Sequence, residues 1–323
     1  MYKVLPTECN LPETRNPTLV SVIIPTYNRN VYLKEAIESC IAQTYRPIEC
    51  IIVDDGSTDG TQKLIEGLQT VLDESFFLKY IYQNNAGSQV ARNTGSDAST
   101  GEFIQYLDSD DLLYPKKIER QVAFLREYPG CDAVWGDWAK GTKADNIIIR
   151  SVARQDLLTQ MLTEHCIVNF SFLMRRAIVE KIGLWDIKIK RNQEIDFQVR
   201  GLLAGAKYEH QPQIGGLWRI HDGDRIANTT GAKEFLLFYR KWERILVERR
   251  LFNQQMRVNI ANIYIWLVNS NSDFNQENLA LLQEVVRLNP EINITQKFTM
   301  KILRKFLGLN LFLKFWLLKR SFN

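Results

Sequence analysis

Three carboxylates within four residues follow an apolar run, which is a pattern that could hold a metal ion. Phe103 to Leu107 reads as a buried strand, and Asp108, Asp110 and Asp111 come directly after it. An unpaired carboxylate is too costly to bury, so such a cluster needs a cation. The spacing Asp108-Ser109-Asp110 suits a hard divalent ion, Mn²⁺ or Mg²⁺, that shares its other ligands with water and a phosphate. The alternative is a solvated acidic turn that caps the next helix.

The bulk composition excludes several classes of protein. The chain has 323 residues, of which 45% are hydrophobic and 24% charged, as in an ordinary globular protein of one large domain or two smaller ones. A net charge of +4 is too small to indicate a nucleic-acid partner. The five cysteines are scattered and form no CxxC pair, which favours reduced thiols in a cytosolic protein. No apolar run reaches the roughly 18 residues of a membrane-spanning helix.

The elements that must position the carboxylates repeat four times. Apolar runs that read as buried strands are residues 19–24, 48–53, 78–82 and 103–107, and the polar loops after them are 26–29, 54–58, 84–87 and 108–111. Helical periodicity follows each loop, so the pattern predicts a parallel sheet with helices on both faces. Right-handed crossovers place all four loops at one edge, where ligands bind in open α/β sheets. This convergence favours the metal site over the acidic turn.

Phosphate cannot be held here by a glycine-rich cradle. No GxGxxG follows the first strand, and no GxxxxGK[ST] occurs anywhere in the chain. A metal ion and basic side chains must therefore hold any phosphate, which agrees with the three aspartates.

Four motifs resemble the successive blocks of family 2 glycosyltransferases. They are SVIIPTYNR (Ser21–Arg29), VDDGSTDGT (Val53–Thr61), ARNTG (Ala91–Gly95) and YLDSDD (Tyr106–Asp111), in that family's usual order and spacing. One block alone is a weak signal, whereas four that span about residues 20–111 are a strong one. The resemblance implies a GT-A fold, a Rossmann-like mixed sheet with helices on both faces. It also implies a nucleoside-diphosphate sugar donor, a divalent metal and inversion at the anomeric carbon.

The resemblance also assigns donor-binding residues. It implies that the nucleotide contacts Pro25, Thr26, Tyr27, Arg29, Asp55, Arg92, Asp108 and Ser109. Asp108 lies near the ribose, and Asp110 ligates the metal on the diphosphate. The residue types agree, because Asp55 can accept from a pyrimidine imide N–H and Tyr27 offers a stacking face. Asp54 is expected to be buried and structural, and Asn28 and Asp59 to cap helices.

A second carboxylate pair stands in the stretch RNQEIDFQVR, residues 191–200. The family pattern here is Glu-Asp, then an acidic residue two positions on, then arginine. Alignment on Arg200 places Glu194 where the catalytic aspartate normally stands and Gln193 where the preceding glutamate stands, so both depart from the pattern. Glu194 is our first candidate for the base that deprotonates an acceptor hydroxyl, and Asp196 is the second. On a helix the two side chains point about 200° apart, so only one faces the cleft. The alternative is that both are helix-start charges favoured by the dipole.

The sequence WRIH, residues 218–221, follows a strand-like run and supplies two further candidates. Arg219 is expected to contact the diphosphate. His221 is a third candidate metal ligand beside Asp110 and Asp108, although a lone histidine is more often structural. His165 and His210 are expected to be structural.

The last quarter of the chain reads as helices followed by a basic tail. Residues 234–251, 256–268 and 278–288 have helical periodicity, and no acidic residue occurs after Glu291. In the tail, lysines and arginines alternate with leucines and aromatic residues, which suits an anionic membrane surface. The alternatives are packing on the protein's own domain or a homodimer through the C-terminal helices.

These patterns together predict an N-terminal leader (1–18), a GT-A catalytic domain (19–230) and a C-terminal helical region with a basic amphipathic tail (231–323). The expected protein is a cytoplasmic glycosyltransferase, peripheral on the inner face of the plasma membrane. It moves a sugar from a nucleotide-sugar donor, by family analogy UDP-linked, to a hydroxyl of a glycan or lipid-linked acceptor in bacterial surface polysaccharide synthesis. One rival is a non-catalytic member that binds a nucleotide sugar. The other is a nucleotidyltransferase with the same sheet, but it needs a basic, glycine-rich loop where this chain has PTYNRN.

Overall fold

The computed structural model describes residues 3–4, 16–69, 75–150, 156–164, 168–221, 231–270 and 276–290. The chain divides into two compact units, Met1–Asp224 and Arg225–Asn323.

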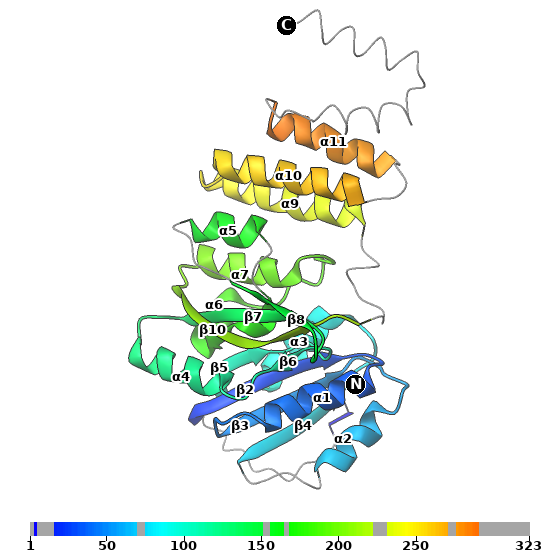
Figure 1. Cartoon of the computed structure of the whole chain (residues 1–323), viewed down its shortest axis with the longest axis vertical. Coiled ribbons are helices and arrows are strands. Elements are labelled where there is room, and N and C mark those ends of the chain that lie inside the picture. The colour runs from blue at the N-terminus through cyan, green and yellow to red at the C-terminus, as the bar shows by residue number, and fades with distance from the viewer. Residues whose placement is uncertain are drawn as a thin grey trace, which may run out of the picture. The chain divides into compact units, whose positions relative to one another are not determined.

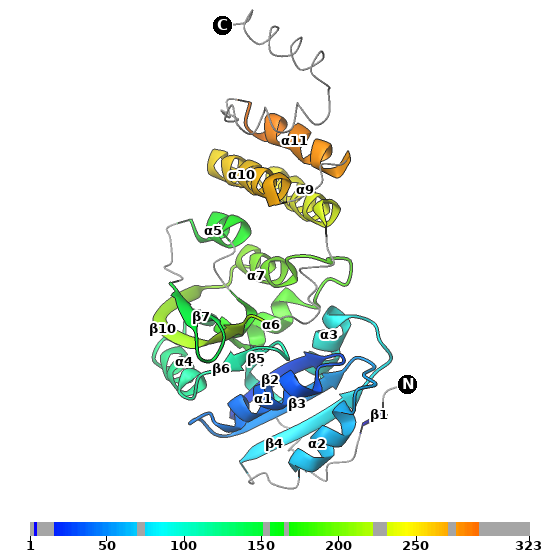
Figure 2. The ribbon, with the colours of Figure 1, turned by 45° about the vertical axis from the view of Figure 1, so that its right-hand side comes forward.

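Within the described residues, the first unit is built on one ten-stranded sheet (Figures 1 and 2). Its strands are β1 (Lys3–Val4), β2 (Asn16–Thr26), β3 (Ile48–Asp54), β4 (Phe76–Tyr82), β5 (Gly101–Tyr106), β6 (Leu112–Leu113), β7 (Ala133–Gly141), β8 (Asn146–Ile149), β9 (Leu173–Arg175) and β10 (Tyr208–Arg219). They lie in the order β1-β4-β3-β2-β5-β9-β7-β10-β6, and β8 pairs with β7.

The sheet is parallel in its first half and mixed in its second. β4, β3, β2 and β5 are parallel, as the repeated strand, loop and helix pattern predicted. β9 is antiparallel to both β5 and β7, and β6 is antiparallel to β10. Every residue of β3 is buried, because helices cover both faces of a parallel sheet. The predicted α/β architecture with a mixed sheet is confirmed.

Most helices of the first unit cover the two faces of this sheet, and one, Leu157–Thr163, packs on the helix Gln193–Leu203. They are α1 (Asn30–Ile41), α2 (Thr61–Gln69), α3 (Ser88–Ala98), α4 (Lys117–Glu127), α5 (Leu157–Thr163), α6 (Arg176–Ile182), α7 (Gln193–Leu203) and the single 3₁₀ turn η1 (Asn169–Ser171). α3 lies unusually close to the sheet because of Gly95, where a Cβ would meet the Ile23 side chain at 2.4 Å. This close approach fixes the position of Arg92, which is one turn earlier on the same helix.

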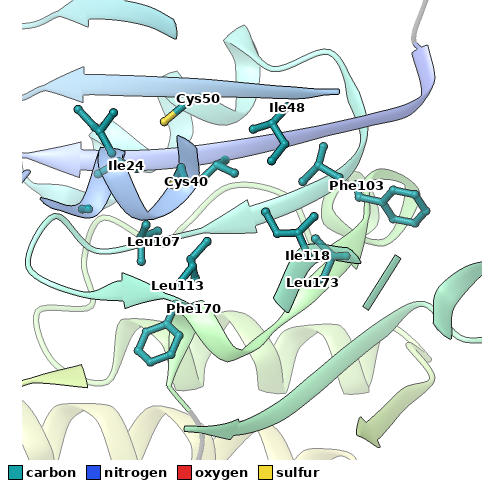
Figure 3. Close-up of a cluster of buried hydrophobic side chains, with 14 of the residues drawn as sticks. Ile24, Cys40, Ile48, Cys50, Phe103, Leu107, Leu113, Ile118, Phe170 and Leu173 are labelled. Atoms are coloured by element: carbon teal, nitrogen blue, oxygen red, sulfur yellow. The ribbon is translucent and has the colours of Figure 1, made fainter. Parts of the chain in front are cut away.

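The main core lies between the sheet and the layer formed by α1, α2 and α4 (Figure 3). Alternate residues of β2, such as Val22 and Ile24, face this layer and pack with Leu33 and Ile37 of α1. All four side chains are fully buried, and burial of each such side chain contributes about 1.5–3 kcal/mol. The core therefore anchors the strands whose ends carry the polar loops.

Three elements differ from the sequence-based expectation. Part of the expected leader belongs to the sheet, because Lys3–Val4 forms β1 and β2 begins at Asn16. The apolar run 170–174 has the composition of a single strand, but the Phe172 N–H donates to the Asn169 carbonyl at 3.3 Å and closes η1, which leaves Leu173–Arg175 as β9. The strand β6 is a pair of buried leucines that pairs with β10, and two residues are too short to show a strand period in the sequence.

The second unit contains helices α9 (Ala232–Glu248), α10 (Gln254–Ser270) and α11 (Gln276–Leu288) in its described part. Tyr239 of α9 and Tyr264 of α10 pack edge to face in its interior, with ring centroids 5.7 Å apart. These helices agree with the predicted helical region, whereas the predicted basic tail, which follows Glu291, lies outside the described residues. No helix in the described part of the chain is long and apolar enough to span a bilayer.

Candidate active site

The loops after neighbouring parallel strands meet at the carboxyl edge of the sheet. The N–H of Asp55, after β3, donates to the carbonyl of Thr26 at the end of β2 over 2.8 Å. Gly56 has φ +88°, and a Cβ there would lie 3.0 Å from the Asn85 backbone nitrogen. Glycine therefore permits both the turn and the close approach of the third loop. The predicted convergence of these loops is found in the structure.

Asp55 organises the loop after β4. Its Oδ1 accepts from the Gln83 side chain at 2.7 Å and from the Ala86 N–H at 2.8 Å, and its Oδ2 accepts from the Gly87 N–H at 2.8 Å. The residue is only 4% exposed. A carboxylate can accept about four hydrogen bonds, so Asp55 retains capacity for one further donor.

The loop after β2 presents one exposed aromatic ring at this edge. Tyr27 is 50% exposed, whereas Pro25 and Thr26 are buried in the end of β2. Asn28 joins this loop to the next one, because its Oδ1 accepts from the Thr58 N–H at 2.8 Å. Tyr27 is therefore held on a fixed loop with a face open for stacking.

Asp54 and Asp59 have structural contacts, as expected from the sequence. Asp54 is 1% exposed and accepts from the Tyr80 hydroxyl at 2.6 Å. Asp59 accepts from the N–H of Asn30, the first residue of α1, at 2.8 Å. These carboxylates hold the loops and helix ends in place.

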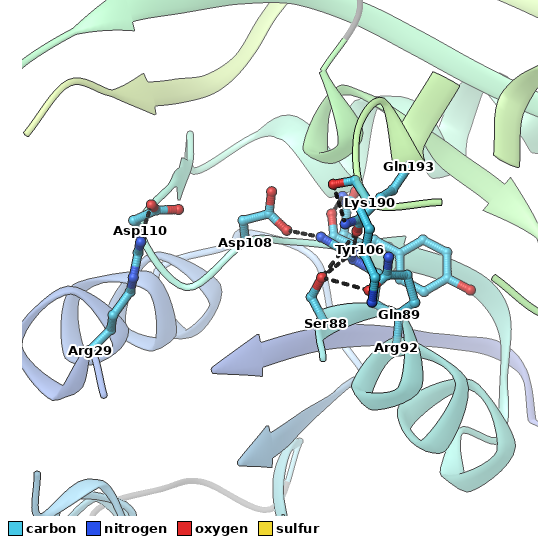
Figure 4. Close-up of polar contacts among 10 residues, drawn as sticks. Arg29, Ser88, Gln89, Arg92, Tyr106, Asp108, Asp110, Lys190 and Gln193 are labelled. Carbon is cyan, nitrogen blue, oxygen red and sulfur yellow. Dashed lines mark hydrogen bonds and ion pairs between the residues drawn. The ribbon is translucent and has the colours of Figure 1, made fainter. Parts of the chain in front are cut away.

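Asp110 lies between two basic side chains. The Arg29 guanidinium forms an ion pair with Asp110 Oδ2 (Figure 4), and the Nε2 of His221 is 3.0 Å from the same oxygen. His221 is nearly buried, with 5% of its side chain exposed, and packs on the Tyr32 ring at a centroid distance of 4.5 Å. Residues from three distant parts of the sequence thus meet at this carboxylate.

Asp111 and Arg219 are buried supports of the same loop. Burial, with the negative charges of Asp110 and Asp108, raises the pKa of Asp111 well above its usual range, although the Arg219 N–H donates to it at 3.1 Å. The Arg219 guanidinium donates to the Asp110 carbonyl, the Glu35 carboxylate and the Tyr32 carbonyl. Arg219 therefore holds the backbone of the carboxylate loop.

Arg92 connects Asp108 to the start of α7 (Figure 4). Its Nη2 donates to Asp108 Oδ1 at 2.7 Å and its Nη1 donates to Gln193 Oε1 at 2.9 Å. The Ser88 hydroxyl also donates to Gln193 Oε1, at 3.0 Å. The guanidinium lies 4.7 Å from the Trp185 ring centroid, which adds a cation–π contact. Asp108 itself is partly exposed, with 38% of its side chain accessible, while Ser109 is buried.

The two candidate bases in the first turn of α7 have different environments. Asp196 has 1% of its side chain exposed and accepts from Arg200 Nε at 3.0 Å, one turn along the helix. Glu194 is partly buried, and burial together with the negative charge of Asp108 raises the pKa of its carboxyl. Glu194 is therefore electrostatically coupled to the Asp108 edge, whereas Asp196 is coupled to Arg200.

Comparison with known proteins identifies the family. The model of "Glycosyl transferase family 2" matches residues 21–183. The chain belongs to this family. It is a glycosyltransferase, as the four motifs indicated.

Several known proteins resemble this family 2 glycosyltransferase over different lengths. An uncharacterized glycosyltransferase of Rickettsia typhi is 30% identical over 247 residues, covering 74% of each chain. The putative teichuronic acid biosynthesis glycosyltransferase TuaG of Bacillus subtilis is 38% identical over 109 residues, which are 34% of this chain and 42% of TuaG. The crystal structure of S. aureus TarS in complex with UDP-GlcNAc has 18% identity and a TM-score of 0.56, covering 88% of this chain and 76% of that one. The TarS likeness concerns the fold.

The residues around Asp110 fit a divalent ion that takes most of its ligands from elsewhere. No group of three or more His, Cys, Asp or Glu side chains in the described part of this glycosyltransferase is arranged as a complete metal site. Asp110 and His221 nevertheless converge at 3.0 Å. Two protein ligands suit an ion that is completed by substrate phosphates and water. A metal here would share Asp110 with Arg29.

Sequence reasoning missed the partners that hold the predicted residues. Gln193 replaces the glutamate of the family pattern but keeps a hydrogen-bond acceptor for Arg92. Ser88 could have been found from its spacing, because it precedes Arg92 by four residues on one helix. Glu35 gave no signal in the sequence, since its contact with Arg219 spans 184 residues. Of the two other histidines, His210 lies 3.0 Å from the buried Asp137 and His165 lies outside the described residues.

Proposed function

We propose that the protein is a metal-dependent, inverting glycosyltransferase that uses a nucleoside-diphosphate sugar, with uridine as the base. The observation that carries the proposal is the meeting of Asp110, Arg29 and His221 at the edge that also presents Asp108 and, from the first turn of α7, Glu194. The charged side chains at Asp110 suit a metal-bound diphosphate. The carboxylate of raised pKa, Glu194, suits a base.

The nucleotide is held by the loops after β2, β3 and β5. Tyr27 stacks on the base, and the remaining acceptor capacity of Asp55 takes up the imide N–H of uracil. Asp108, oriented by Arg92 at 2.7 Å, accepts hydrogen bonds from the ribose hydroxyls. This assignment is supported by the exposed ring of Tyr27 and by the partly exposed Asp108 carboxylate.

The diphosphate lies at Asp110, His221 and Arg29. Mn²⁺ or Mg²⁺ held by Asp110 and His221 would neutralise charge that develops on the leaving diphosphate. Asp108, the third candidate ligand, is engaged by Arg92. Arg29 adds a positive charge at the same carboxylate. Arg219 acts on this site indirectly, because its guanidinium is engaged by protein oxygens.

Glu194 is the base of the transfer step. Its carboxylate accepts the proton of an acceptor hydroxyl while that oxygen bonds to the anomeric carbon from the face opposite the diphosphate. The bond from the anomeric carbon to the diphosphate oxygen breaks, and the nucleoside diphosphate leaves with the electron pair. A raised pKa makes Glu194 a better proton acceptor at neutral pH. The configuration at the anomeric carbon is inverted because one displacement occurs.

The acceptor is a hydroxyl of a glycan or glycolipid of the bacterial surface. This part of the proposal is supported by the resemblance to TuaG, whose name places it in teichuronic acid biosynthesis. It is also supported by the basic, apolar composition of residues 297–323, which suits a peripheral position on the inner face of the plasma membrane.

Thermal unfolding with nucleotides tests the donor site. UDP, GDP, CDP and dTDP would each be added with and without Mn²⁺ or Mg²⁺ to the wild type, to Asp110→Ala and to Asp97→Ala, a control carboxylate exposed on α3. A ligand at 100 times its Kd adds about 2.7 kcal/mol of stability. We expect UDP to stabilise the wild type and Asp97→Ala only with metal, and not to stabilise Asp110→Ala. Absence of stabilisation by all four diphosphates would contradict the proposal and favour the non-catalytic rival.

A further inference from the structure

Asn169 is a buried amide that no protein group satisfies. The residue is 7% exposed, and neither its Oδ1 nor its Nδ2 has a hydrogen-bonding partner within the described part of the chain. Among those described residues, it is the one buried side chain with both a donor and an acceptor atom left without a partner.

The turn that carries Asn169 lies at the ligand-binding edge of the sheet. β9 is antiparallel to β5 and β7, between which it lies. The residues that precede β9 therefore lie toward the carboxyl ends of β5 and β7, where the Asp108 loop begins. The side chain of Gln105, on β5, donates to the Phe170 carbonyl at 3.0 Å, which confirms that η1 lies against this strand.

The backbone of this turn is held without the help of the Asn169 side chain. The Ser171 hydroxyl donates to the Val168 carbonyl at 2.7 Å, and the Phe172 N–H donates to the Asn169 carbonyl at 3.3 Å. The neighbouring side chains of Phe170 and Ser171 are buried. The amide therefore has no evident role in forming the turn.

Folding alone does not favour an amide at this position. A buried donor or acceptor without a partner is destabilising, and an apolar side chain of the same shape avoids that penalty. A polar group retained against stability at a ligand-binding edge is typical of a functional site. An amide offers one acceptor and donors side by side, which matches the hydroxyl groups of a sugar ring.

We infer that Asn169 binds hydroxyl groups of the sugar that is being transferred and helps to select that sugar. This inference rests on the proposed function, because it assumes that the donor diphosphate lies at Asp110. A sugar attached to that diphosphate extends along the same edge toward the catalytic carboxylate on α7. Selection is strong at such a position, since a donor sugar that cannot pair with the amide leaves it unsatisfied in the complex.

The test compares UDP with UDP-sugars on Asn169→Leu, a variant of similar shape without the amide. Dissociation constants would be measured for UDP, UDP-GlcNAc, UDP-glucose and UDP-galactose with Mn²⁺ and without acceptor, and thermal unfolding would be measured without ligand. We expect the Kd for UDP to change less than about 2-fold and the Kd for the sugar that the wild type prefers to rise about 10-fold, the effect of one lost hydrogen bond. The unliganded variant should be at least as stable as the wild type.

Two further variants complete the design. Asn278→Leu replaces a buried asparagine on α11 of the helical unit and should leave both dissociation constants unchanged. Asn169→Asp keeps the shape but removes the amide donor, and should again raise the Kd for the UDP-sugar more than that for UDP.

The inference is overturned if Asn169→Leu lowers stability or binds the UDP-sugar as the wild type does. It is also overturned if both Asn169→Leu and Asn169→Asp fail to fold. It is also overturned if the wild type binds UDP but gains no affinity from any of the sugars. Absence of UDP binding by the wild type would count against the proposed function itself.

Discussion

At the scale of residues, the carboxylates of Glu194 and Asp196 lie on one helix, two positions apart, in different electrostatic environments. Asp196 is buried beside Arg200, and its charge is neutralised locally. Burial raises the pKa of Glu194, and the negative charge of Asp108 raises it further. The helical geometry predicted that only one of them could face the cleft. The contacts now favour Glu194 as the base and Asp196 as a structural partner.

Paired substitutions separate these roles. Glu194→Gln should abolish transferase turnover while UDP-sugar binding and thermal stability stay near the wild-type values. Asp196→Asn should lower the free energy of unfolding by about 1–3 kcal/mol, because it leaves the Arg200 charge without its buried partner. The folded fraction of Asp196→Asn should remain active. Turnover would be measured as nucleoside diphosphate release, and stability by denaturant unfolding. Full turnover in Glu194→Gln, or an inactive but fully stable Asp196→Asn, would reverse the assignment.

At the scale of elements, the parallel half of the fold was readable from the sequence and the mixed half was less so. Each parallel strand is a continuous apolar run between helices, so its burial can be predicted from the local sequence, as for residues 48–53. The apolar run 170–174 carries no periodicity that would show that a 3₁₀ turn, η1, overlaps its start. Asp110 and Asp108 could be predicted from spacing. Their partners, Arg29 and Arg92, reach them only through tertiary packing, as does the Gln193 side chain that accepts from Arg92. No local pattern identifies those pairs.

The docking of α11 depends on an ionised glutamate. Burial opposes ionisation of Glu284, but hydrogen bonds from Arg240 and Arg287 outweigh it and hold its pKa below the ordinary value of 4.5. Arg240 reaches Glu284 from α9 at 2.8 Å. A carboxyl whose pKa is lowered on folding contributes stability above its unfolded pKa and loses that contribution as the pH falls through the folded value.

Glu284→Gln should therefore be less stable than the wild type at neutral pH. The difference in Tm between the two proteins should shrink as the pH is lowered below 4.5 and vanish once the wild-type carboxyl is protonated. The control is Glu277→Gln, at the exposed start of α11. A Tm difference that stays constant with pH would show that Glu284 acts through packing and not through its charge.

At the scale of the whole molecule, the proposed catalytic residues and the C-terminal region belong to different units of the chain. All residues of the proposed donor site belong to the first unit, Met1–Asp224, and none belongs to the second unit, Arg225–Asn323. The sequence of the second unit ends in a segment that carries seven basic and no acidic residues between 297 and 320. Such a segment is attracted to anionic lipids with about 1 kcal/mol per basic side chain near the surface. We therefore expect the second unit to determine whether the enzyme binds to a membrane surface.

Deletion of residues 296–323 tests this division. The shortened chain should bind UDP and metal as the full chain does, but should no longer sediment with vesicles of phosphatidylglycerol. A triple variant of the full chain, Lys301→Glu, Arg304→Glu and Lys305→Glu, should also lose vesicle binding, because the attraction depends on charge. The molar masses of the full chain and of the deletion variant would be measured by light scattering. Loss of a dimer on deletion, with vesicle binding unchanged, would assign these residues to self-association instead of the membrane. Sedimentation of the shortened chain with the vesicles would exclude the tail as the membrane-binding element.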